Sequence, residues 1–241
     1  MTASSKSTVE EIRARFDADV ERFSELETGQ VAAMDSAYCL QLMADACGAL
    51  HPKATSLLDL GCGAGNYSLK VLQAIPTLRE IHLVDLSEPM LTRAQERLKN
   101  ATAAMSFLYQ TDMRELEFEE AVFDLIVTSA ALHHLREEHE WVSMFEKLYC
   151  WLKPGGSVWI YDLLVEESPE LEAINRKRYS DYLVGLKGEA YRDQVFAYIE
   201  KEDTPRSLEF QVGLLQRVGF GRVHILHRNA CFGMFGAVKS A

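Results

Sequence analysis

An apolar segment, residues 56–60, leads directly into three alternating glycines at positions 61, 63 and 65, and Asn66 then opens a stretch with helical periodicity. Glycine has no Cβ, so this piece of main chain can adopt positive φ and approach a ligand closely. The pattern predicts a strand, a tight turn and a helix, with a nucleoside-bearing ligand held at the turn.

The rest of the chain alternates between strand and helix patterns. This alternation predicts a mostly parallel, doubly wound α/β sheet covered on both faces. The short connection Asn229-Ala230 predicts that the last two strands form an antiparallel hairpin. Strands are expected at residues 56–60, 81–86, 106–111, 123–129, 157–164, 222–228 and 231–239, and helices at 65–74, 88–99, 138–152 and 207–218.

The 241 residues are enough for one large α/β domain, which we divide into four parts. The apolar residues of the first part recur at helical spacing, and the third part is charged, rich in tyrosine and helical in pattern. The four parts are a helical flap (1–52), a cofactor-binding core (53–164), a helical cap (165–206) and a C-terminal helix and hairpin (207–241).

Composition narrows the class of protein. Hydrophobic residues make up 48% and charged residues 25% of the chain, which are ordinary globular values. A net charge of −11 disfavours electrostatic binding of nucleic acid and favours a small-molecule partner. The five cysteines form no C-x-x-C pair, so we expect reduced thiols. The sequence shows no membrane-spanning or signal segment, and we expect a cytoplasmic protein.

Asp85 supports a nucleoside ligand independently of the glycines. It ends the second predicted strand, where a carboxylate can accept both hydroxyls of a ribose. The glycines follow the pattern G-x-G-x-G, whereas dinucleotide folds usually carry G-x-G-x-x-G to seat a pyrophosphate. A nicotinamide oxidoreductase is therefore the less favoured reading.

These features resemble the class I S-adenosylmethionine-dependent methyltransferases. Residues 58–65 (LDLGCGAG) resemble the first motif of that family, and residues 84–91 resemble the second. Further matches are the acidic turn at 111–113, the segment 123–135 (FDLIVTSAALHHL) and the turn at 152–156 (LKPGG). The resemblance implies a seven-stranded Rossmann-like sheet with an antiparallel last strand.

The resemblance also implies that S-adenosyl-L-methionine is the cofactor and S-adenosyl-L-homocysteine the product. Asp59 would help to order the methionyl ammonium, Asp85 would bind the ribose, and Asp112 would accept the adenine amine. The full expected set of cofactor-binding residues is Asp59, Gly61, Cys62, Gly63, Gly65, Asp85, Leu86, Met90, Asp112, Met113 and Ser129.

Methyl transfer from a sulfonium is an in-line displacement, so an enzyme gains mainly by aligning the reactants and excluding water. A general base is optional. His133 and His134 follow the fourth strand, and His133 is the candidate catalytic residue, although this pair can also simply cap the strand. His139 lacks the cysteine or carboxylate partners of a metal site, so no metal is expected.

The cap supplies the candidate substrate-binding residues Arg178, Tyr179 and Tyr182. Guanidinium and phenol groups suit a small anionic or aromatic substrate. The tyrosines also fit one apolar helix face, so packing is the alternative. From the flap, Phe16, Arg22 and Phe23 are candidates to close over the cofactor.

We therefore predict a methyltransferase that acts on a small molecule, without stable nucleic-acid binding or membrane attachment. Two alternatives stay open: an enzyme that modifies the cofactor, like the carboxy-S-adenosylmethionine synthases, and a non-catalytic S-adenosylmethionine-binding protein. Substrate identity and the atom methylated are left open, as is a homodimer.

Overall fold

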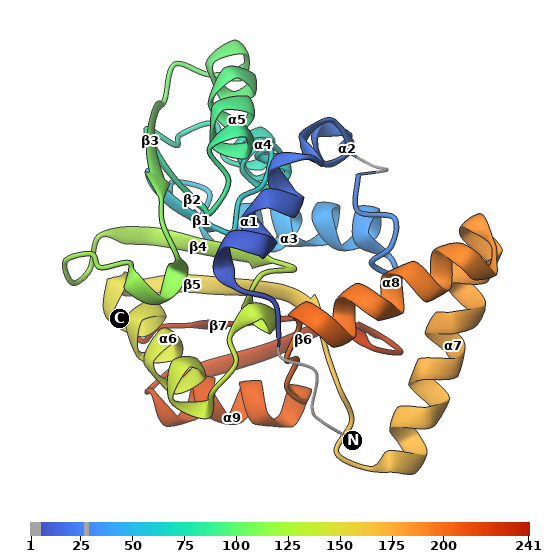
Figure 1. Cartoon of the computed structure of the whole chain (residues 1–241). Helices are drawn as coiled ribbons and strands as arrows, with labels where there is room; N and C mark the ends of the chain where they lie inside the picture. Colours follow the sequence, from blue (N-terminus) through green and yellow to red (C-terminus); the bar gives the residue numbers. More distant parts are fainter. Residues whose placement is uncertain (1–5, 27–28) are drawn as a thin grey trace.

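The computed structural model describes residues 6–26 and 29–241, and its centre is one seven-stranded sheet with the order β3-β2-β1-β4-β5-β7-β6 (Figure 1). Strands β1 to β5 are parallel, and β7 pairs antiparallel with both β5 and β6. This confirms the predicted sheet. The strands are β1 (Ser56–Leu60), β2 (Glu80–Asp85), β3 (Met105–Gln110), β4 (Phe123–Ser129), β5 (Leu152–Leu163), β6 (Arg222–Asn229) and β7 (Phe232–Val238).

Helices cover both faces of the sheet and create two apolar clusters. Figure 1 shows α3, α4 and α5 over one face and α6 and α9 over the other, while α7 and α8 project from one side. The helices are α1 (Val9–Asp17), α2 (Val20–Ser24), α3 (Ser36–Leu50), α4 (Asn66–Ala74), α5 (Glu88–Ala101), α6 (Glu138–Trp151), α7 (Pro169–Lys187), α8 (Glu189–Glu202) and α9 (Leu208–Arg217), with short 3-10 turns η1 (Met113–Glu115) and η2 (Leu132–His134).

Strand β5 begins earlier than predicted. Leu152 already pairs with Phe123, and the next pair joins Ser157 to Leu125, so residues 153–156 form a bulge in the strand. The predicted proline-glycine turn is this bulge, with Gly155 at φ +81°. The bulge lets one strand continue past a turn sequence.

The flap begins with two short helices, α1 and α2, separated by a break after Asp17, and ends with the longer α3. Thr8 caps α1 through a capping box with Glu11, and Asp19 precedes α2. The chain before α1 lies against the end of α8, because the Ser7 amide donates to the Lys201 carbonyl at 3.0 Å. Segments from opposite ends of the sequence are thereby joined.

The cap is also held to the segment before α3. The hydroxyls of Tyr179 and Tyr182 in α7 donate to the carbonyls of Ala32 and Val31 at 2.9 and 2.7 Å. Within residues 6–26 and 29–241, no helix combines the length and the apolar composition needed to span a membrane.

Candidate active site

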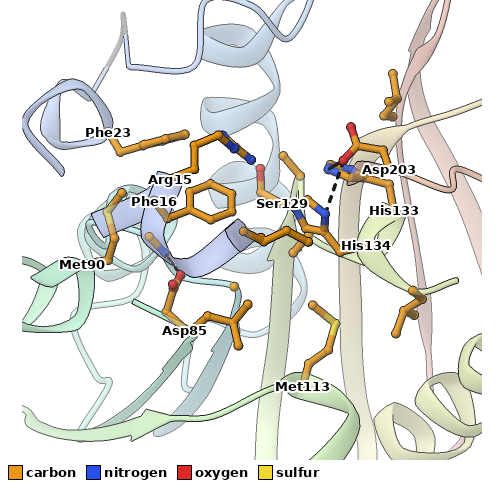
Figure 2. Close-up of a pocket in the computed structure, with 18 of the residues that line it drawn as sticks. Arg15, Phe16, Phe23, Asp85, Met90, Met113, Ser129, His133, His134 and Asp203 are labelled. Carbon is orange, nitrogen blue, oxygen red and sulfur yellow. Dashed lines mark hydrogen bonds and ion pairs between the residues drawn. The ribbon is translucent and has the colours of Figure 1, made fainter. Parts of the chain in front are cut away.

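A cavity of about 160 Å³ lies at the carboxyl ends of β1, β2 and β4, with α1 forming one wall. Figure 2 shows Asp85 toward one end, the group of His133, His134 and Asp203 toward the other, and Phe16 between them. Open parallel sheets hold ligands at this edge. Residues of the core, the flap and the cap all line this cavity.

The turn after β1 gives the cavity part of its floor. Gly61 has φ +75°, and a Cβ there would lie 2.5 Å from the Cβ of Ala131. Gly63 has φ +49° and lines the cavity, and a Cβ there would have no described heavy atom within 4 Å. Gly63 therefore leaves main chain open to the cavity where any other residue would place a side chain.

The carboxylate of Asp85 is fixed by the same turn. One oxygen accepts from the Gly63 amide at 2.8 Å, and the other accepts from the Ser87 amide at 2.9 Å. Burial raises the pKa of Asp85 above its ordinary value. Each oxygen keeps a further lone pair, so the group can accept two hydroxyls from a ligand in the cavity.

The walls near Asp85 are largely apolar, with Leu86, Met90 and Met113 lining them. Asp112 lies there as well and accepts from the Arg114 amide and Nε, each at 2.9 Å. Although burial raises the pKa of Asp112, the hydrogen bonds from Arg114 lower it more, and the net shift is downward. Asp112 is thus a charged acceptor beside a flat apolar wall.

Three of the expected cofactor-binding residues lie behind the turn and do not line the cavity. The Asp59 carboxylate accepts from the Ser68 amide and hydroxyl at 3.1 and 2.6 Å, and burial raises its pKa to about 7. The Cys62 side chain is buried, and Gly65 lies where a Cβ would be 3.0 Å from the Cβ of Ala94. These residues shape the turn.

His133, on η2, lines the cavity and is held by the end of β5. Its amide donates to Asp162 at 3.0 Å, and its Nδ1 is hydrogen-bonded to the other oxygen of Asp162. Burial alone would lower the pKa of His133, but the charges of Asp162 and Asp203 raise it to about 9. The ring therefore has a fixed orientation, with Nε2 on the side of Asp203.

Asp203 is a cavity residue that the sequence analysis missed. It follows α8 at the end of the cap, and its carboxylate oxygen lies 3.3 Å from Nδ1 of His134. Burial and the neighbouring charge of His133 hold the pKa of His134 well below its ordinary value. No pattern in the sequence links Asp203 to the histidines, because only the packing of the cap brings them together.

The cap residues predicted to bind substrate occupy three different environments. Tyr179 is buried and lines the cavity, whereas Tyr182 does not line it and Arg178 is exposed on α7. The arrangement gives no support to Arg178 or Tyr182 as substrate contacts, since Tyr182 is engaged by a backbone carbonyl and Arg178 faces solvent.

A guanidinium does line the cavity, but it comes from α1. Arg15 donates through Nε and Nη2 to Glu202, at 2.9 and 2.6 Å to one carboxylate oxygen. It also lies over the rings of Phe16 and Tyr198, at 4.3 and 5.1 Å from the centroids. Phe16, Arg22 and Phe23 line the cavity as well, consistent with the expected position of the flap.

Residues 57–156, which contain the glycine turn, Asp85 and both cavity histidines, match the family model of the methyltransferase domain. The chain contains a methyltransferase domain. The nicotinamide alternative is therefore set aside.

Two curated relatives of this chain are named for different activities. It is 28% identical over 196 residues to a carboxy-S-adenosyl-L-methionine synthase of Helicobacter pylori, covering 79% of this chain and 78% of the relative. It is 25% identical over 188 residues to a demethylmenaquinone methyltransferase of Lactiplantibacillus plantarum, covering 76% of each.

Solved structures show the same fold at lower identity. Phosphoethanolamine N-methyltransferase 2 of Haemonchus contortus, in complex with S-adenosyl-L-methionine, has a TM-score of 0.67 and 17% identity. The match covers 98% of this chain and 60% of that one. Human N-acetylserotonin methyltransferase has a TM-score of 0.61 and also 17% identity, with 98% and 61% covered.

Proposed function

We propose that this protein transfers the methyl group of S-adenosylmethionine to a small-molecule acceptor that binds at the histidine end of the cavity. The observation that carries this proposal is the continuity of one cavity from Asp85 to Asp203, bordered by flap, core and cap. A cavity of about 160 Å³ walled by α1 suits a small molecule better than a folded macromolecule.

The residues present fit the cofactor. Gly63 leaves open space at the floor, Asp85 offers two oxygen acceptors for a ribose diol, and Asp112 offers one for the adenine amine. Apolar contacts to the adenine would come from Leu86, Met90 and Met113. Gly61 and Ser129 also line the cavity, and Asp59, Cys62 and Gly65 would support the turn from behind.

The bound cofactor supplies an electrophilic methyl group on a sulfonium. The protein's contribution is alignment of the acceptor and exclusion of water. Phe16 and Phe23 of the flap, whose ring centroids are 5.7 Å apart, would exclude water from the cavity. His133 stays the candidate catalytic residue, and Asp162 fixes its ring.

A second candidate function, carboxy-S-adenosylmethionine synthesis, is favoured by the relative from Helicobacter pylori and by Arg15 on the cavity wall. A guanidinium is the group best suited to a carboxylate. In this structure, however, Glu202 already engages Arg15 through both of its oxygens. We therefore prefer methyl transfer.

Mass spectrometry tests both candidates. The protein would be incubated with S-adenosylmethionine carrying a labelled methyl group, together with the small-molecule or the macromolecular fraction of a cell extract. We expect label in a small molecule and formation of S-adenosylhomocysteine. Label in the macromolecular fraction, a carboxylated cofactor bound to the purified protein, or cofactor binding without turnover would each contradict the proposal.

Asp85→Ala is the matched variant for cofactor binding. Loss of two charge-assisted hydrogen bonds is expected to weaken binding of S-adenosylhomocysteine by about 1–3 kcal/mol, or about 5- to 150-fold. Calorimetric titration measures this change. Glu88→Gln, an exposed residue at the start of α5, is the control and should bind as the wild type does. Equal affinities of the two variants would remove the ribose assignment.

A further inference from the structure

Three potential metal ligands meet at the histidine end of the cavity. Nε2 of His133 lies 3.8 Å and Nδ1 of His134 lies 3.3 Å from the same oxygen of Asp203. One donor atom from each residue lies within 4.8 Å of the other two. Ligands bonded at about 2.1 Å to one tetrahedral ion are about 3.4 Å apart. The spacing of these atoms is close to that of a coordination shell.

Among the described residues, two of these three atoms, on Asp203 and His134, are buried without hydrogen-bond partners. Asp203 is 4% exposed, and among the described residues its Oδ1 has no hydrogen-bond partner of acceptable geometry. The same holds for both ring nitrogens of His134. A buried polar group without a partner costs free energy, and a buried carboxylate costs most. A cation between the three residues would bind Oδ1 of Asp203 and one ring nitrogen of each histidine.

The neighbouring contacts orient the donors. Asp162 is hydrogen-bonded to Nδ1 of His133, which leaves Nε2 for the side of Asp203. Metal-bound histidines almost always donate their other ring N–H to a carboxylate or carbonyl in this way. The Thr204 amide also donates to the His133 carbonyl at 2.7 Å, which ties the segment after α8 to η2. Arg15 is engaged by Glu202 and leaves the Asp203 carboxylate free.

We propose that His133, His134 and Asp203 bind one divalent first-row transition-metal ion, such as Zn²⁺. Two imidazoles and one carboxylate form a donor set suited to such ions, and three protein ligands leave coordination positions open. All three residues line the cavity, so the open positions face the space for the acceptor (Figure 2). An oxygen or nitrogen donor of the acceptor would bind there.

The sequence analysis expected no metal because it found no carboxylate to join the histidine pair. Asp203 supplies that carboxylate from the cap. The proposal concerns ion binding and can therefore be tested without any methyl-transfer assay.

The test is calorimetric titration of the metal-free full-length chain with Zn²⁺. We expect one ion per chain, with the affinity reduced at least 10-fold in Asp203→Asn and in His134→Gln. Asp162→Asn, which changes the carboxylate that orients His133, should lower the affinity about 10- to 100-fold. His227→Gln is the matched control, because His227 also lies beside a carboxylate, 2.9 Å from Asp35, but does not line the cavity. It should bind Zn²⁺ as the wild type does.

The chain has five free cysteines, so binding through thiolates must be distinguished from binding through nitrogen and oxygen. A parallel titration with Co²⁺ does this through the absorption spectrum of the bound ion. Each variant is checked by circular dichroism, and if Asp203→Asn fails to fold, His134→Gln carries the same comparison. The proposal is overturned if the chain does not bind Zn²⁺, or if Asp203→Asn and His134→Gln bind it as tightly as the wild type. It is also overturned if His227→Gln loses binding, or if bound Co²⁺ shows the spectrum of a thiolate complex. S-adenosylhomocysteine affinity, measured separately, reports on the proposed function and not on the metal.

Discussion

Asp59 and Asp85 are acidic residues on adjacent parallel strands, yet their surroundings give them different tasks. Asp85 ends β2 and faces the cavity, where backbone amides fix its two oxygens. Asp59 lies within β1 and its carboxylate is bonded to Ser68 at the start of α4. Asp59 pairs with Leu83, so it lies two residue positions before the level of Asp85 along the parallel strands. Asp59 therefore joins strand to helix, and its protonation affects the stability of that junction.

The pH dependence of stability should report this buried carboxyl. Burial raises the pKa of Asp59 from 3.8 to about 7 in the folded protein. Between these two pH values the folded state binds a proton that the unfolded state has lost, so the stabilisation from Asp59 falls as the pH rises and is gone above about pH 7. Asp59→Asn removes this fall.

Urea denaturation between about pH 5 and about pH 8 measures the effect as the difference between wild type and variant. Asp45→Asn, an exposed residue on α3, is the control and should run parallel to the wild type. If Asp59→Asn also runs parallel, the carboxyl has an ordinary pKa in the folded protein.

At the scale of elements, strands were the easiest to predict. The bounds of β1 and β4 agree with the sequence analysis to the residue, because apolar runs between turn residues indicate a strand buried on both faces. Local patterns also indicated the hairpin of β6 and β7. Residues whose position depends on the turn itself, such as Gly63, Asp85 and Met90, were likewise predicted and line the cavity.

Contacts between distant elements were not predictable from local patterns. Asp203 and Arg15 line the cavity only because the end of α8 packs beside η2 and α1. Tyr182 fits an apolar helix face in the sequence, but its hydroxyl donates to Val31, a choice decided by where α7 comes to lie. Periodicity reports which face of a helix is buried and not what lies against it.

The pairing of α1 with α8 leads to a prediction about stability. Glu202 is 5% exposed and is held by Arg15, so Arg15→Ala leaves a buried carboxylate without its partner. Breaking a buried pair in this way is costly, and because Arg15 itself is partly exposed we expect a loss of about 1–3 kcal/mol in the free energy of unfolding. Urea denaturation measures this loss.

Lys177→Ala provides the comparison, since Lys177 pairs with Asp181 on the exposed surface of α7. Lys177→Ala should change the free energy of unfolding by less than about 0.5 kcal/mol. Two variants of equal stability would show that the contact between α1 and α8 contributes little.

At the scale of the whole molecule, the sheet separates two apolar clusters, and β7 lies inside it between β5 and β6. Gly236 in β7 lies against Trp159 of β5, where a Cβ would overlap both the indole ring and the Val158 carbonyl. Backbone and ring are both fixed there. The centre of the sheet is therefore intolerant of even one added methyl group.

Gly236→Ala should lower the free energy of unfolding by about 1–3 kcal/mol, the usual cost of overpacking. Gly213→Ala offers the opposite case, because Gly213 is an exposed residue of α9 with no described heavy atom within 4 Å of the added Cβ. Gly213→Ala should raise the free energy of unfolding by up to about 1 kcal/mol, because alanine has the better helix propensity. Calorimetric melting of both variants tests the pair, and a harmless Gly236→Ala would show that the sheet can adjust.

The two ends of the cavity differ in composition, because the histidine end adds residues from outside the matched domain to His133 and His134. Gly63 and Asp85 fall within the stretch shared with the methyltransferase domain, while Arg15, Tyr179 and Asp203 come from outside it. Substitutions in the flanking helices can therefore change which acceptor binds while the residues around Gly63 and Asp85 stay the same. Enzymes built this way can diversify their products while inheriting an unchanged sheet.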